Sequence, residues 1–60
     1  MNVRREIFIE FVVQGAFAKA TAIDPVSGLE ASIVGPARAP QALLAEQARR
    51  KLEYLAKKQK

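Results

Sequence analysis

The sequence contains no cysteine, no histidine and no tryptophan. Without cysteine the chain can form no disulfide, no thiolate metal site and no thiol nucleophile. Without histidine it lacks the usual imidazole base and the commonest metal ligand. Its three glycines are isolated, so no phosphate-binding glycine loop is present. These absences argue against an enzyme, a resident metal and a cofactor, and we expect a non-catalytic protein.

Size limits the stability that this chain can reach alone. It has 60 residues, half of them hydrophobic, and a net charge of +4. A domain of about 60 residues buries only about 60% of its unfolded surface, so its core is marginal. Because disulfides and thiolate sites are excluded, oligomerisation is the remaining common source of stability. We therefore predict a single small domain over residues 1–60 that forms a homodimer.

No segment indicates export or insertion into a membrane. The apolar run over residues 7–13 is short, contains Glu10 and is not followed by a cleavage-like sequence. No stretch approaches the roughly 18 apolar residues of a membrane span. We expect a cytoplasmic protein that has no contact with a membrane.

Residues 6–13 show the alternation of a half-buried β-strand, and they are rich in β-branched and aromatic side chains. Gly15 can take the positive φ of a two-residue turn of type II′. A loop of Gly15 and Ala16 then pairs Gln14 with Phe17, which begins a second strand. One face of the first strand carries Ile7, Ile9, Phe11 and Val13, and the other carries Glu6, Phe8, Glu10 and Val12.

Residues 24–29 read Asp-Pro-Val-Ser-Gly-Leu, which is typical of a tight loop between strands. A four-residue loop places Ala22 opposite Ala31 and Ala20 opposite Ile33. We therefore predict an antiparallel sheet with the second strand in its centre. The expected strands lie near residues 4–14, 17–24 and 29–35.

From about residue 40 to residue 58 the pattern is helical, and Pro40 suits the first helical position. The stripe at helical spacing consists of Gln41, Leu44, Ala45, Ala48, Leu52 and Leu55. We expect this stripe to cover the sheet face that carries Ile7, Ile9, Phe11, Val13, Ala18, Ala20, Ala22, Ala31 and Ile33. The predicted fold is α+β, a three-stranded antiparallel sheet (β-β-β) with one C-terminal α-helix packed on one face.

The sheet face away from the helix carries large apolar side chains that a monomer would leave exposed to solvent. With the pairing above, that face brings together Phe8, Val12, Phe17, Ile23 and Val34. An exposed patch of this kind usually marks an interaction surface, and we expect self-association through it. The alternative is that strand twist and the N-terminal residues cover part of this face.

The positive charge is concentrated near the C-terminus, where residues 38–60 carry seven Lys and Arg but only two Glu. One interpretation is a basic helix that touches the phosphates of a nucleic acid. Its candidate contacts are Arg38, Arg49, Arg50, Lys51, Lys57 and Lys58. The other interpretation is a solvated helix face with cations near the negative end of the helix dipole. Glu46 with Arg50, and Glu53 with Lys57, have the spacing of ion pairs within such a face.

Four segments together resemble a family of short bacterial proteins of unknown function, over about residues 6–55. They are Glu10-Phe11-Val12 with Gln14-Gly15, Thr21-Ala22-Ile23-Asp24-Pro25 with Gly28, Ser32-Ile33-Val34-Gly35, and Arg50-Lys51-Leu52-Glu53-Tyr54. The resemblance implies a bacterial, cytoplasmic origin and no activity, cofactor or catalytic residue.

The expected fold is also similar to plant AP2-type and phage-integrase arm-type DNA-binding domains. Those domains place Arg and aromatic side chains of the sheet in the major groove. Here the outer sheet face carries Glu6, Glu10 and Glu30, which would repel phosphates. We therefore favour a self-associating protein-interaction module, with a protein partner possible and nucleic-acid binding as the alternative.

Overall fold

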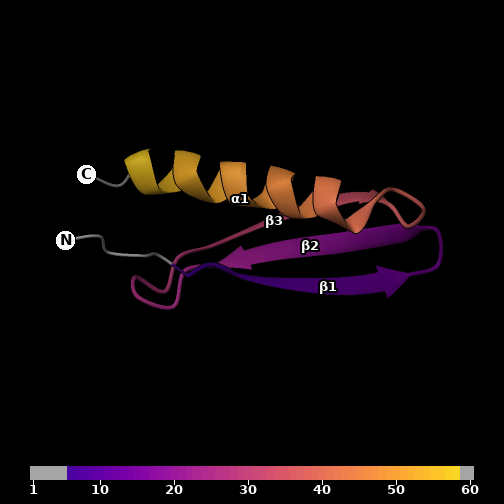
Figure 1. Ribbon diagram of the computed structural model, residues 1–60, viewed down its shortest axis with the longest axis horizontal. Helices are drawn as coiled ribbons and strands as arrows, with labels where there is room; N and C mark the ends of the chain where they lie inside the picture. Colours follow the sequence, from indigo (N-terminus) through magenta and orange to yellow (C-terminus); the bar gives the residue numbers. More distant parts are fainter. Residues whose placement is uncertain (1–5, 59–60) are drawn as a thin grey trace.

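The computed structural model describes residues 6–58 and shows one antiparallel sheet followed by one helix (Figure 1). The strands β1 (Phe8–Gln14), β2 (Phe17–Ile23) and β3 (Glu30–Pro36) lie side by side in this order, so β2 is central and the predicted α+β fold is confirmed. Of the first strand that we predict near residues 4–14, residues 4 and 5 lie outside the described residues, and residues 6 and 7 precede β1 instead of belonging to it. The helix, α1, spans Gln41–Lys58.

The hairpin of β1 and β2 forms through the predicted two-residue turn. Gly15 has a φ of 60°, whereas Ala16 has a negative φ, which is the sign pattern of a type II′ turn. Gln14 pairs with Phe17, and the register continues to the pair of Phe8 with Ile23. The register predicted for this hairpin is therefore confirmed along the whole strand.

The loop between β2 and β3 is organised by Asp24, which is buried. Its carboxylate accepts a hydrogen bond from the backbone N–H of Val26 at 2.9 Å. Its backbone N–H donates to the carbonyl of Leu29 at 2.9 Å, which closes the four-residue loop as predicted. The resulting register pairs Ala22 with Ala31, and it confirms the predicted central position of β2.

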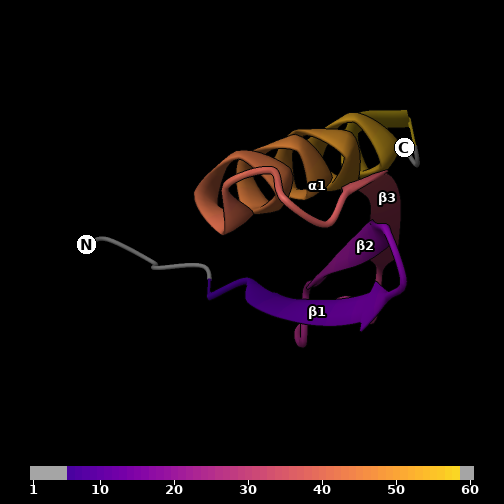
Figure 2. The ribbon, with the colours of Figure 1, turned by 90° about the vertical axis from the view of Figure 1, so that its right-hand side faces the viewer.

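Helix α1 lies over β2 and β3, as Figure 2 shows. The alanines of these two strands form a flat bed that the helix can approach closely. At Gly35 the helix and the sheet are in close contact, since a Cβ atom there would lie 2.7 Å from Cδ2 of Leu44. The buried core consists of Ala18, Ala20, Ala22, Ala31, Leu44, Ala48 and Leu52.

Two members of the predicted core are exposed instead. Val13 was expected under the helix but is 57% exposed. The helix packs on β2 and β3, so strand β1 lies to one side of it. Gln41 is also exposed, because the first helical turn meets the sheet through Leu44. Ile9 and Phe11 stay half-buried beside the core.

Candidate interaction surfaces

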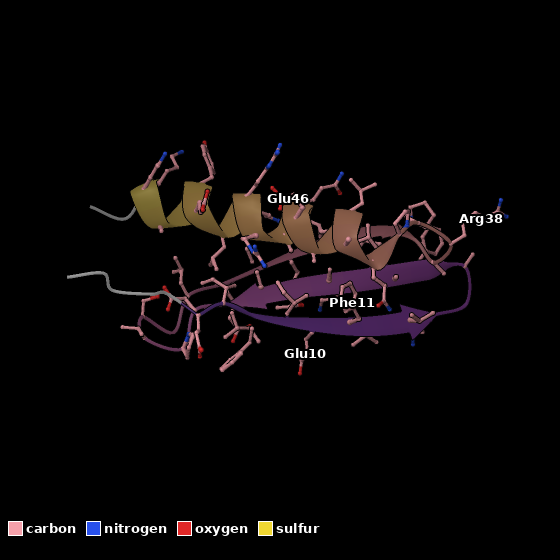
Figure 3. All side chains as sticks on the ribbon, in the orientation of Figure 1. Glu10, Phe11, Arg38 and Glu46 are labelled. Atoms are coloured by element: carbon pink, nitrogen blue, oxygen red, sulfur yellow. The ribbon has the colours of Figure 1, made fainter. Side chains whose placement is uncertain are left out.

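The outer face of the sheet, on the side away from α1, is built from alternate residues of all three strands. Figure 3 shows this alternation on β1, where Phe11 points toward the helix and Glu10 points away from it. The register arranges the outer-face side chains in four rows across the sheet. In order along the strands, the rows are Phe8–Ile23–Glu30, Glu10–Thr21–Ser32, Val12–Lys19–Val34 and Gln14–Phe17–Pro36.

The structure brings the five residues of the predicted self-association surface to this one face. Phe8, Val12, Phe17 and Val34 are each more than half exposed, and Ile23 is half-buried. They occupy three of the four rows. Their exposure fits a binding surface, and their role in self-association remains a prediction.

Polar groups divide the apolar residues of the outer face. The hydroxyls of Thr21 and Ser32 form a hydrogen bond at 2.8 Å between neighbouring strands, so each hydroxyl has a hydrogen-bond partner within the face. Lys19 lies between Val12 and Val34 in the third row. Glu10 belongs to the second row and Glu30 to the first. The face therefore has a negative end and a positive centre.

The cations proposed as phosphate contacts are spread over different surroundings. Arg50 donates through Nε to Oε2 of Glu46 at 3.2 Å, as its spacing predicts, and both side chains are exposed. The other predicted pair, Glu53 with Lys57, lies beyond ion-pair distance. Exposed ion pairs of this kind contribute little free energy to stability, so a spacing of four residues does not by itself bring Glu53 and Lys57 together.

Two further cations of this set have contacts that sequence spacing did not indicate. Lys51 donates through Nζ to the backbone carbonyl oxygen of Ser32 on β3, at 2.9 Å. The Nζ of Lys58 lies 5.2 Å from the centre of the Tyr54 ring. Arg38 is exposed in the connection before α1 and lies apart from the helical cations (Figure 3). The six candidates therefore do not form one continuous cationic stripe.

A hollow of about 250 Å³ lies between α1 and the chain that leads into β1. It is lined by Ile7, Asp24, Arg49, Leu52, Glu53 and Ala56. These residues come from three separate parts of the sequence, so no local pattern could have predicted it. Within residues 6–58, no group of three carboxylates is placed to hold a metal ion.

The fold and its surfaces define a class of small protein, a three-stranded sheet with a single covering helix and an exposed, largely apolar outer face. The chain belongs to the family described as "Domain of unknown function (DUF6898)", which matches residues 4–59. No curated protein and no solved structure matches the chain.

Membership of this family confirms the predicted resemblance to proteins of unknown function. The comparisons give no support to the predicted bacterial origin or to the likeness to AP2-type and integrase arm-type domains. Over residues 6–58, no helix has both the length and the apolar character that crossing a membrane requires.

Proposed function

We propose that this protein is a small non-catalytic module of the cytoplasm that associates with itself through the outer face of its sheet. The observation that supports the proposal is the placement of its large apolar side chains. Phe8, Val12, Phe17 and Val34 are all more than half exposed, and all four lie on one face. An exposed patch of this kind on a small protein is typical of an interaction surface.

The composition of the core supports the same proposal. Within residues 6–58, five of its seven buried residues are alanines, and the other two are Leu44 and Leu52. Other large side chains that pack against this core, Ile9, Phe11 and Ile33 among them, are only partly buried. Burial of one Phe contributes roughly 1.5–3 kcal/mol. A dimer that covers Phe8 and Phe17 would therefore supply the apolar burial that the monomer lacks.

The charges on the outer face are self-complementary. When a second copy is turned by 180° about an axis that runs across the strands, the row of Lys19 faces the row that contains Glu10. The same rotation brings the row of Phe8 over the row of Phe17. Sheets that stack in this way keep their strands within about 30° of each other. Each lysine then lies near a carboxylate of the other copy.

The size of the face predicts a weak dimer. Three strands of seven residues cover about 14 by 23 Å at ordinary strand spacings. The area of such a face is smaller than the roughly 800 Å² that each partner buries in a standard specific interface. We therefore expect association at micromolar concentrations.

Sedimentation of single variants tests the proposal. Phe8→Glu places a carboxylate in the apolar face and should shift the chain from dimer to monomer. Val26→Glu is the matched control, because Val26 is 84% exposed in the loop after β2 and lies outside the face. The control should sediment like the wild type. A wild-type chain that stays monomeric at high micromolar concentration would contradict the proposal.

The alternative function is nucleic-acid binding by the basic helix. The exposed positions of Arg49, Arg50 and Lys57 on α1 favour it. Against it stand the ion pair of Arg50 with Glu46 and the use of Lys51 within the fold. Aromatic side chains on which bases could stack are also scarce on the helix, where Tyr54 is the one present. We therefore rank this function second.

A further inference from the structure

The outer edge of β1 offers a row of unpaired backbone groups. The turn closes with a hydrogen bond between the C=O of Gln14 and the N–H of Phe17, and antiparallel pairs alternate from there. This alternation directs the N–H and C=O groups of Ile9, Phe11 and Val13 away from β2. Within residues 6–58, no strand pairs with this edge.

The opposite edge of the sheet is partly blocked, at two of its outward positions. By the same alternation, the backbone groups of Ser32 and Pro36 point to the outer edge of β3. The carbonyl of Ser32 accepts the hydrogen bond of Lys51, and proline has no N–H to offer. Lysine and proline at a sheet edge are common devices against further strand pairing. β1 contains neither residue, and Glu10 is its one charged residue.

The side chains of β1 on the helix side are also incompletely covered. Because α1 lies over β2 and β3, Ile9 and Phe11 are half-buried and Val13 is 57% exposed. In Figure 2, β1 is the strand farthest from the helix. The backbone and the side chains of β1 are therefore both open to a partner.

We propose that two copies of this chain pair their β1 strands edge to edge, antiparallel, with Phe11 on the two-fold axis. This register pairs Ile9 of one copy with Val13 of the other and joins two three-stranded sheets into one continuous sheet. All outward N–H and C=O groups of β1 find partners. Phe11 is the middle residue of β1, so the whole strand overlaps.

Charge selects this register over its neighbour. With Phe11 on the axis, Glu10 lies opposite Val12 of the second copy. A shift by two residues that moves Glu10 onto the axis would place two carboxylates directly opposite each other, which is destabilising. The opposite shift keeps the charges apart but shortens the overlap. The hydrogen-bonding groups and the charge of the β1 edge are therefore complementary to those of the same edge in a second copy.

This inference rests on the proposed self-association and adds a second contact to it. The edge contact has its two-fold axis perpendicular to the sheet, whereas the face contact has its axis within the sheet plane. The two contacts use different residues, so both can form in one tetramer of two stacked sheets with closed symmetry.

Disulfide trapping tests the edge contact and its register, since the wild-type chain has no cysteine. Ile9→Cys and Val13→Cys are made as separate chains, then mixed under mild oxidation. Directly opposite residues of a hydrogen-bonded pair lie about 5.5 Å apart at Cα, within disulfide range. The mixture should form a covalent heterodimer at least about tenfold faster than either chain alone, because only the mixed pair aligns the two sulfurs.

The same mixture in a Val34→Glu background separates this inference from the proposed function. Val34 belongs to the outer face and lies on β3, away from the open edge. Trapping that persists there supports the edge contact, even if the face contact fails. A different outcome overturns the edge contact and leaves the face contact standing. In that outcome the wild type is a dimer, Val34→Glu makes it monomeric, and the mixture of cysteine variants forms no disulfide.

Two further outcomes would also overturn the edge contact. The first is trapping of either cysteine variant alone at the rate of the mixture, which indicates random collision. The second is a monomeric wild type without trapping, which leaves the edge to a strand from another protein.

Discussion

The ammonium group of Lys51 on α1 donates a hydrogen bond to the backbone carbonyl oxygen of Ser32 on β3, at 2.9 Å. The bond joins two residues that are 19 positions apart, and it fastens the helix to the sheet. It also occupies an acceptor at the outer edge of β3, which otherwise could pair with another strand. A lysine that the sequence offers as a phosphate contact is thus part of the fold.

Replacement of Lys51 by Met tests this structural role. Met keeps most of the aliphatic length of the side chain but cannot donate to Ser32, so the free energy of unfolding should fall by about 0.5–1.5 kcal/mol. Lys57→Met is the matched control, because Lys57 makes no hydrogen bond or ion pair within residues 6–58. Urea unfolding followed by circular dichroism measures both. Equal stability of the two variants would show that the Lys51 bond contributes nothing.

Replacement of Gly35 by Ala tests the close approach of α1 to β3. The added Cβ would lie 2.7 Å from Cδ2 of Leu44, a side chain that is only 3% exposed and cannot move freely. Overpacking of this kind costs about 1–3 kcal/mol of unfolding free energy. Leu44→Ala removes the clash, so the double variant should lose less stability than the sum of the two single changes. Additive losses in urea unfolding would show that the two residues do not interact.

The salt dependence of binding tests the alternative function. If four cations of α1 neutralise phosphates, the log–log slope of affinity against salt is about −3.6, roughly a 150-fold loss between 50 and 200 mM salt. We expect instead no tight complex with a labelled DNA duplex or RNA at physiological salt, as measured by fluorescence anisotropy. Submicromolar binding with that slope, abolished by reversing the charges of Arg50 and Lys57, would place nucleic-acid binding first.

The strand register could be predicted from the sequence because local chemistry sets it. Gly15 supplies the positive φ of a two-residue turn, and Asp24 organises a loop of fixed length. Once both loops are known, the two-residue period of a strand assigns every side chain to a face. The residues of the outer face, Phe8 and Val34 among them, can be assigned from this register and this alternation.

The order of the elements, their pairing and the composition of both sheet faces therefore follow from local sequence features alone. The position of α1 across the sheet, the exposure of Val13 and the hydrogen bond from Lys51 to Ser32 depend instead on tertiary packing. The physical reason is that helical periodicity shows which side of a helix is buried but not which strands it covers. That choice depends on the combined shape of alanines from β2 and β3 and of Gly35, which come together only when the chain has folded.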